Sequence, residues 1–322
     1  MRAFKILITI TGVASIALGG LWVSGASEEV DEVSLAQKEI GLLLDSQMVD
    51  VGGVNLHVVF AGPTNGEPVI LIHGFPEFWY MWRHHIKALA DQGYRVAAID
   101  MRGYNRSDKP KGRASYSMKK YASDITGLMD TQGWPNANIV SHDIGSLVAW
   151  KLVFDYAARV KRAVIFSAPH PLSSEEVDTQ SDTSWYRRFF RLPVLPELMS
   201  RLGGLDLMAN GLIDSSRPGT FSEQQIGLYK NVWMRDHAYY SMLGAYRNEW
   251  HQFDNMPANG STTMPVMYIN GLLDQFVPSA ASLATKKYLG EDNVRLFPEL
   301  SHWILKEEPE LTATEIISFL QR

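Results

Sequence analysis

The stretch SHDIG, residues 141–145, has the residue types and spacing of a nucleophile elbow with an acidic side chain, Asp143, at its centre. In such an elbow a strand turns sharply into a helix, and small residues such as Ser141 and Gly145 let the two elements approach closely. The turn projects the central side chain, so a carboxylate there can attack a substrate. Asp is also among the best helix N-caps, so a plain cap is the alternative reading of this position.

Two more polar residues follow apolar runs later in the chain. Asp274 comes just after the run 265–271, and His302 follows the run VRLFP, residues 294–298. The chain order nucleophile, acid, histidine is the order of an α/β-hydrolase triad. We therefore expect His302 to activate water and Asp274 to orient and stabilise its ring.

A third feature, HGFPE at residues 73–77, ends an earlier apolar run. The backbone N–H groups of Phe75 and Ile144 are predicted to form an oxyanion hole, because an elbow needs two such donors beside the nucleophile. A simple strand-ending turn at His73 and Gly74 is the alternative.

Several other histidines lack a setting of this kind and are expected to be structural or solvated. His57 falls on a strand predicted to be exposed, His84 and His85 on a surface helix, and His237 and His251 in a helical region.

The elements that must position these residues alternate between strand and helix signals. Short apolar runs at 68–74, 94–100, 138–143, 162–169 and 265–271 suit strands buried on both faces of a parallel sheet, while residues 55–62 alternate like an exposed strand. Helical patterns lie between them at 81–91, 116–131, 145–157 and 279–289. The alternation predicts an α/β fold with a mostly parallel, doubly wound sheet, whose strand ends collect the functional residues.

The alternation stops between residues 172 and 257, where aromatic residues recur at helical spacing. We expect a helical cap at 172–257, inserted into a core made of residues 47–171 and 258–322. Residues 27–46 are polar and acidic and are expected to form a tether or an arm along the domain.

Residues 1–26 resemble a secretory signal, since Arg2 and Lys5 precede an apolar run and Ser24 and Ala26 fit the small-x-small cleavage rule. We expect cleavage after Ala26 and an exported protein. The alternative is an uncleaved anchor, the one case in which we expect membrane attachment. The chain has no cysteine, so export would bring no disulfides.

Composition narrows the partners. The chain of 322 residues carries a net charge of -5, and its 30 basic residues form no run, so a nucleic-acid partner is not expected. No pair of potential ligands has metal spacing, and neither a metal nor a cofactor is expected. The ligand should be small and uncharged.

Residues 47–322 resemble the epoxide hydrolase branch of the α/β-hydrolase superfamily, with HGFPEFWYMWRHHI, DMRGYNRSDKP, HDIG and SHW in the expected order. The resemblance implies hydrolysis of an uncharged, hydrophobic epoxide to a vicinal diol. It also implies two cap tyrosines that assist the opening ring, assigned to Tyr246 in AYRNEW and to Tyr186, with aromatic packing as the rival role of Tyr186. Tyr239 and Tyr240 are the reserve candidates. The pocket is expected to be lined by Phe75, Trp79, Tyr80 and cap aromatics, although these could equally be core.

An aspartate nucleophile suits this chemistry. Serine attack on saturated carbon would leave an ether that water cannot cleave, whereas a carboxylate leaves an ester whose carbonyl carbon, Cγ of Asp143, water can attack. The oxyanion then forms on Asp143 itself, where each oxyanion-hole donor contributes about 2.7–4 kcal/mol.

Two other functions remain open. A dehalogenase could use the same triad, but haloalkane dehalogenases carry Trp where this chain has Ile144, and fluoroacetate dehalogenases carry arginines where it has Ile144 and Leu147. A non-catalytic binding protein would show a broken triad. Ser167 occupies the strand end where some relatives place the acid, which leaves Asp274 for that role.

Overall fold

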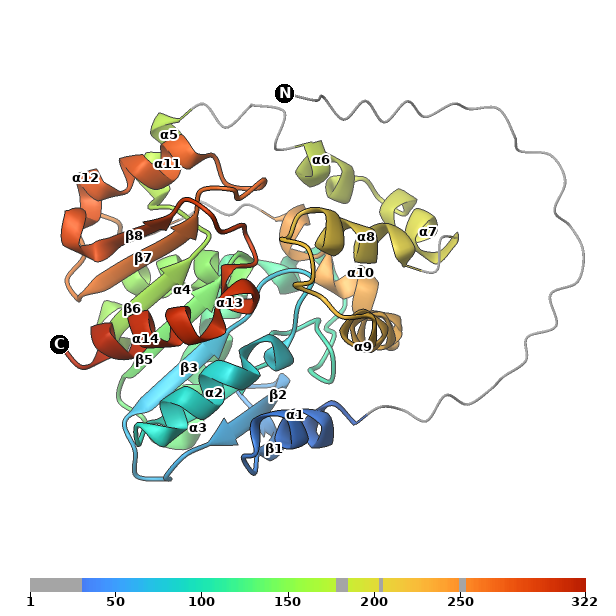
Figure 1. Ribbon diagram of the computed structural model, residues 1–322, viewed down its shortest axis with the longest axis horizontal. Helices are drawn as coiled ribbons and strands as arrows, with labels where there is room; N and C mark the ends of the chain where they lie inside the picture. The colour runs from blue at the N-terminus through green and yellow to red at the C-terminus, as the bar shows by residue number, and fades with distance from the viewer. Residues whose placement is uncertain (1–30, 178–184, 203–204, 249–252) are drawn as a thin grey trace, which may run out of the picture. The chain divides into compact units, whose positions relative to one another are not determined.

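Eight strands form one sheet in the order β1-β2-β4-β3-β5-β6-β7-β8 (Figure 1). The strands are β1 (Asp45–Asp50), β2 (Asn55–Ala61), β3 (Pro68–Ile72), β4 (Arg95–Ile99), β5 (Ala137–His142), β6 (Val160–Phe166), β7 (Val266–Gly271) and β8 (Val294–Phe297). β2 is antiparallel to both β1 and β4, and every later pair is parallel. The predicted mostly parallel sheet is confirmed.

The computed structural model describes residues 31–177, 185–202, 205–248 and 253–322, except the side chains of 185–186 and 199–202. The predicted signal segment, residues 1–26, lies outside these ranges. Within them, no helix has the length and apolar character needed to cross a membrane.

Helices cover both faces of the sheet. α3 (Met118–Gln132) packs on α4 (Ile144–Asp155) on one face, and α2 (Arg83–Asp91) packs on α14 (Pro309–Leu320) on the other (Figure 1). Shorter helices α11 (Ser279–Ala284) and α12 (Lys286–Leu289) follow β7, and α13 (Ile304–Glu307) follows β8. This double covering explains why β5 and β7 are buried along their whole length.

The prediction of an exposed strand at 55–62 is wrong. All residues of β2 after Asn55 are buried, because β1 pairs along its outer edge and α2 packs on it. The polar side chain of His57 gave this strand the alternating pattern from which we predicted exposure. Its Nδ1 lies 2.6 Å from a carboxylate oxygen of buried Asp100, and a paired polar side chain can be buried at little cost.

The arm is a folded part of the protein from Asp31 onward. α1 (Glu32–Ile40) begins at Asp31, whose carboxylate accepts a hydrogen bond from the Val33 amide, and it packs against α2. Glu32 is fully buried and accepts hydrogen bonds from Arg106 of the core and Arg235 of the cap. The arm therefore joins core and cap.

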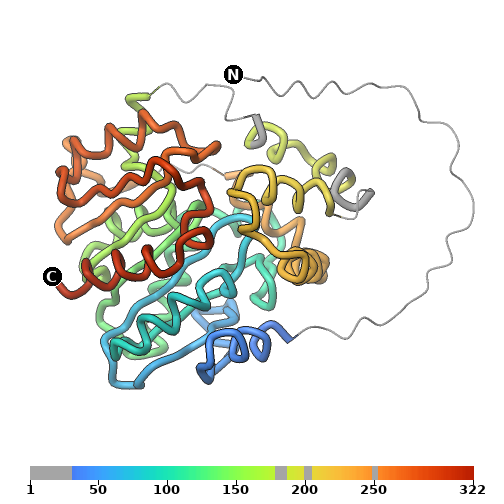
Figure 2. The backbone as a smooth tube through the Cα atoms, in the orientation of Figure 1, coloured from blue at the N-terminus to red at the C-terminus, as the bar shows by residue number. Residues whose placement is uncertain are grey.

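The described residues between β6 and β7 form helices joined by turns, and no strand occurs among them. The region contains α5 (Pro171–Glu176), α6 (Trp185–Arg191), α7 (Leu195–Leu202), α8 (Asp206–Asp214), α9 (Glu223–Met234), α10 (Ala238–Met242) and the 3-10 turn η5 (Ala245–Arg247). α5 packs against α11 and so belongs with the core. We use the name cap for the helices α6 to η5, which Figure 2 traces in yellow to orange.

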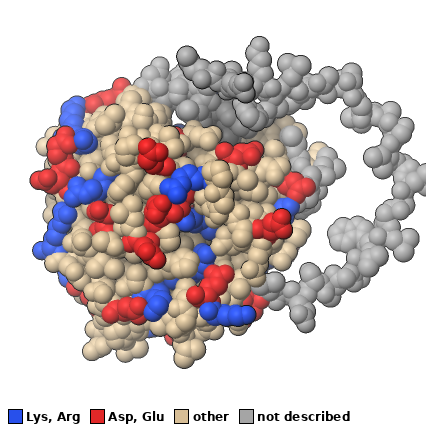
Figure 3. Space-filling model, viewed as in Figure 1, with Lys and Arg blue, Asp and Glu red and all other residues tan. Residues whose placement is uncertain are grey.

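Charged side chains of both signs are interspersed over the face shown in Figure 3. Many form exposed pairs, such as Lys87 with Asp91 and Lys161 with Glu67.

Candidate active site

The backbone at Asp143 makes the sharp turn that the elbow pattern predicts. Its φ of 53° and ψ of −120° lie in a region that L-residues rarely adopt, and α4 starts at the next residue. A Cβ on Gly145 would lie 2.4 Å from the carbonyl oxygen of His73, so only glycine permits this approach of helix and strand. The alternative of an N-cap is not supported, because the Asp143 side chain accepts no capping bond from the helix.

The Asp143 carboxylate is held between two groups. Oδ1 accepts a hydrogen bond from the Phe75 amide at 2.9 Å, and Oδ2 lies 3.5 Å from Nε2 of His302. Burial alone would raise the pKa of Asp143, but the hydrogen bond and charge of His302 outweigh it and lower the pKa to about 2. The carboxylate is therefore ionised at neutral pH. Its side chain is also 18% exposed, and a nucleophile must be both ionised and accessible.

His302 lies in the turn between β8 and α13, with its side chain 2% exposed. The Nδ1 of His302 lies 2.8 Å from Oδ2 of Asp274. The other oxygen of Asp274, Oδ1, accepts hydrogen bonds from the backbone N–H groups of Phe276 and Val277. Burial would lower the pKa of His302, but the negative charges of Asp274 and Asp143 raise it to about 10. The three residues predicted as a triad thus meet in the predicted order.

Both predicted oxyanion-hole residues adjoin the nucleophile, Phe75 through a hydrogen bond and Ile144 as the next residue in the chain. Phe75 already donates its amide to Oδ1 of Asp143. Ile144 is the first residue of α4, so its amide belongs to the first helical turn, where N–H groups lack acceptors within the helix. Oδ1 is consequently the oxygen placed to carry a developing negative charge.

Tyr246 lies in η5, buried at 3% exposure, with its ring 5.1 Å from that of Phe75 and 5.0 Å from that of Phe190. The cap therefore brings this tyrosine next to the loop that holds Asp143. Tyr186 belongs to α6, which packs against η5, but its side chain lies outside the description. The reserve candidate Tyr240 is 52% exposed beneath Arg247.

Trp79 and Tyr80, which were expected to line the pocket, have their closest partners elsewhere. Both belong to the turn η1 (Trp79–Trp82) and are fully buried. The Tyr80 hydroxyl donates to Glu39 of α1, and the Trp79 ring packs against His57 of β2. The 3-10 turn directs these rings toward the arm and the sheet, which sequence spacing alone does not show.

His85 takes the structural one of the two roles expected of it. It is fully buried, with Nε2 2.9 Å from the Thr312 hydroxyl of α14, because α2 and α14 pack together. His84 and His237 are exposed as expected, and His251 lies outside the described residues. Ser167 follows the last residue of β6, and its hydroxyl donates to Oδ1 of Asn270 rather than to a triad side chain.

Three buried groups that sequence reasoning missed lie behind the triad: Glu77, His142 and Lys306. Nε2 of His142 donates to the carbonyl oxygen of His302 at 2.9 Å, and its Nδ1 lies 3.5 Å from Glu77. The Nζ of Lys306 lies 3.8 Å from Glu77. Their only sequence signal was their nearness to the motifs HGFPE, HDIG and SHW.

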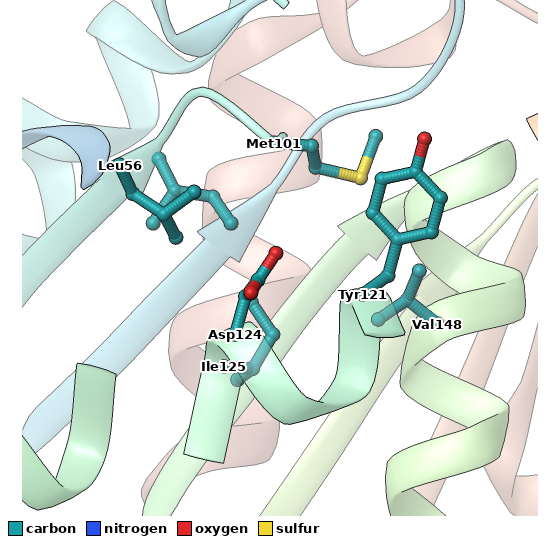
Figure 4. Close-up of a pocket in the computed structure, with 7 residues that line it drawn as sticks. Leu56, Met101, Tyr121, Asp124, Ile125 and Val148 are labelled. Carbon is teal, nitrogen blue, oxygen red and sulfur yellow. The ribbon is translucent and has the colours of Figure 1, made fainter. Parts of the chain in front are cut away.

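The core also contains a gap between the sheet and the helices α3 and α4 that is too narrow to hold a water molecule (Figure 4). It is lined by Leu56, Ile99, Met101, Tyr121, Asp124, Ile125 and Val148. The Asp124 carboxylate is paired with Arg102, and the gap is part of the core packing. Among the described residues, no group of three or more His, Asp or Glu side chains could hold a metal ion.

Comparison with known proteins agrees with this geometry. Residues 67–309 match the family model described as alpha/beta hydrolase fold. The AB hydrolase superfamily protein YfhM of Bacillus subtilis is 33% identical over 85% of this chain and 97% of its own length. Epoxide hydrolase 1 of Caenorhabditis elegans is 30% identical over 86% of this chain and 70% of its own length. The chain belongs to the epoxide hydrolase branch of the α/β-hydrolases.

A solved relative within this branch has the same fold. The crystal structure of the epoxide hydrolase VrEH1 from Vigna radiata is 26% identical and superposes with a TM-score of 0.75, over 86% of this chain and 98% of the other. The sheet described above is therefore that of an α/β-hydrolase fold.

Proposed function

We propose that this α/β-hydrolase converts an uncharged, hydrophobic epoxide to a vicinal diol through a covalent ester on Asp143. The observation that carries the proposal is the carboxylate at the elbow, ionised and held by the Phe75 amide on one oxygen and by His302 on the other. Relatives named as epoxide hydrolases support the substrate class.

The first half-reaction uses Oδ2 of Asp143 as the nucleophile. It attacks an epoxide carbon, the C–O bond of the ring breaks, and the oxygen leaves as an alkoxide that must take up a proton. Tyr246 of the cap, together with Tyr186, is proposed to donate to this oxygen. Oδ1 becomes the ester carbonyl oxygen and keeps its hydrogen bond to Phe75.

Ester formation releases the base for the second half-reaction. In the free enzyme His302 has a pKa of about 10 and is an imidazolium. Esterification removes the charge of Asp143, one of the groups that raise this pKa, so the imidazolium can lose its proton. That proton balances the one that the alkoxide takes up.

Neutral His302 then removes a proton from water, and the hydroxide attacks Cγ of Asp143. The negative charge collects on Oδ1 between the Phe75 and Ile144 amides. When the bond between Cγ and the alkyl oxygen breaks, the diol oxygen takes one proton, and the carboxylate and the imidazolium of the free enzyme are restored. Asp274 keeps the ring of His302 in the orientation that this step requires.

The ester can be trapped. His302→Gln should still open styrene oxide but hydrolyse the ester slowly, so intact mass spectrometry should find one adduct, located on Asp143 by peptide mapping. No adduct on this variant, with no diol from the parent enzyme across several epoxides, would refute the proposal.

A dehalogenase remains the rival with the same triad. Side-by-side assays of epoxide consumption and halide release separate the two functions, and rapid halide release with inert epoxides would favour the rival.

Replacing Tyr186 and Tyr246 together by Phe should lower the rate of ring opening by about 10²–10⁴-fold, the usual contribution of general acid catalysis. Parental rates in that variant would show that the two tyrosines are wrongly assigned.

We further propose that the protein is exported and that residues 1–26 are removed. The support is the basic start, the apolar run and the small residues before Ser27. N-terminal sequencing of the protein from its native source should begin at Ser27. A start at Met1 with the protein in the membrane fraction would instead indicate an uncleaved anchor.

A further inference from the structure

The carboxylate of Glu77 lies where three segments of the active site meet. Glu77 is two residues after Phe75, whose amide holds the nucleophile, and its own amide donates to the carbonyl oxygen of Gly74. His142, which precedes the nucleophile, faces Oε2 of Glu77 at 3.5 Å. The same histidine donates to the backbone carbonyl of His302. One buried acid thus contacts the segments that carry the oxyanion hole, the nucleophile and the base.

The cap reaches the same point. The hydroxyl of Tyr229 on α9 donates to Oε1 of Glu77 at 2.9 Å, and the indole N–H of Trp233 donates to the carbonyl oxygen of Pro76 at 2.6 Å. The position of the Glu77 carboxylate therefore also fixes how the cap sits on the HGFPE loop.

Lys306 provides the positive charge at this junction. It belongs to α13, immediately after the turn that carries His302, and its side chain is 4% exposed. Its ammonium lies 3.8 Å from Oε1 of Glu77 and over the rings of Phe221 and Tyr229, at 4.8 and 4.9 Å. The cation is stabilised by these two ring faces and by one carboxylate.

Three buried polar atoms of this cluster have no hydrogen-bond partner among the described residues: Oε2 of Glu77, Nδ1 of His142 and Nζ of Lys306. Buried polar atoms without partners are rare, and a group of them indicates a site with a function beyond packing. A buried carboxylate also costs much free energy without a nearby cation.

We propose that Lys306 is a positioning residue of the active site: its buried ammonium holds the Glu77 carboxylate in place, and this carboxylate holds the three catalytic segments in register. The inference rests on the proposed ester mechanism. It concerns the second half-reaction above all, because hydrolysis needs the base, the water and the oxyanion hole aligned on one carbon atom, whereas ring opening needs mainly the nucleophile and the tyrosines.

The cluster should make ester hydrolysis depend on pH. Burial lowers the pKa of Lys306 to about 8, with Glu77 opposing the shift and Arg83 adding to it. Glu39 also faces this lysine and favours its charge, while His84 lies close enough to interact with it. Lys306 is therefore charged at neutral pH, and its loss of a proton above about pH 8 should slow hydrolysis.

The test separates the two half-reactions by rapid mixing of the full-length enzyme with styrene oxide, from about pH 6 to 10. Lys306→Met should form the ester within about threefold of the parent rate but hydrolyse it about tenfold more slowly at pH 7, so that the ester accumulates. Lys306→Arg should restore hydrolysis and remove the decline above pH 8, because arginine keeps its charge. Lys287→Met, at an exposed lysine, is the matched control.

A double variant keeps the inference testable if one of the single variants folds poorly. Glu77→Gln with Lys306→Met removes both charges, and its hydrolysis rate should equal that of Glu77→Gln alone, since the lysine acts only through this carboxylate. Parental hydrolysis and pH dependence in Lys306→Met would overturn the inference, as would additive effects in the double variant. If instead the parent forms no ester with any epoxide, the proposed function itself fails.

Discussion

Replacing Asp143 by Asn should lower the pKa of His302, because the amide imitates the uncharged ester. The two side chains lie 3.5 Å apart, and both are largely buried. At that distance, with an effective dielectric constant of about 20, the attraction between the charges is about 5 kcal/mol. Since one pKa unit corresponds to about 1.4 kcal/mol, this sets an upper limit of about three units.

We therefore expect the pKa of His302 to fall from about 10 by one to three units in Asp143→Asn. Histidine-selective NMR titration measures it, with the signal assigned through His302→Gln and retention of the amide checked by mass. Asp91→Asn, which removes a half-exposed carboxylate on α2, is the control and should leave His302 unchanged. A pKa still near 10 in Asp143→Asn would refute the idea that ester formation releases the base.

The pair of His302 and Asp143 should also make the stability of the fold depend on pH. The raised pKa of His302 stabilises the fold fully below about 6.5, and this contribution is lost as pH rises through about 10. The lowered pKa of Asp143 stabilises the fold above 3.8, and this contribution is lost as pH falls through about 2. Urea unfolding from acid to alkaline pH should show both losses in the parent and weaker ones in Asp143→Asn.

Three further predictions concern single side chains. Gly145→Ala should cost about 1–3 kcal/mol in urea unfolding, because its Cβ would overlap a backbone oxygen, whereas Gly211→Ala, with open space around its Cβ, should be neutral or stabilising. Tyr80→Phe should keep kcat/KM for an epoxide within about twofold of the parent value, since the Tyr80 hydroxyl binds Glu39 outside the active site. A large loss would instead indicate that Tyr80 lines the substrate pocket. Asp274→Asn should slow ester hydrolysis by about 10⁴-fold in stopped-flow assays, because the ring of His302 would lose its orienting acceptor; parental hydrolysis would show that Asp274 is not the acid.

The core of the fold was predictable because its signals are local. Each central strand is a short apolar run that ends in a polar residue or glycine, and β3 to β7 begin and end within three residues of those runs. The elbow was predictable for the same reason: small residues at fixed offsets around Asp143 are a property of five consecutive positions. The order of Asp143, Asp274 and His302 at strand ends then implied their meeting, because parallel strands bring those ends to one edge.

The direction of side chains outside such patterns was not predictable. Trp79 and Tyr80 follow HGFPE directly, yet a 3-10 turn directs them to the sheet and the arm. The polar residue His57 led us to predict an exposed strand. Its side chain can be buried because it pairs with Asp100, 43 positions away. His85 is buried for a similar reason, since its partner lies on the last helix.

By itself, the sequence determined the fold class, the family and the acidic residue at the centre of the elbow, because each depends on residue type and short-range spacing. Only the tertiary structure decided that Oδ1 of Asp143 accepts the Phe75 amide and that Glu77, His142 and Lys306 form one buried cluster behind Asp143, Asp274 and His302. These contacts join residues far apart in the chain. Their distances depend on how the sheet, the cap and the final helices pack together, and no local pattern encodes that packing.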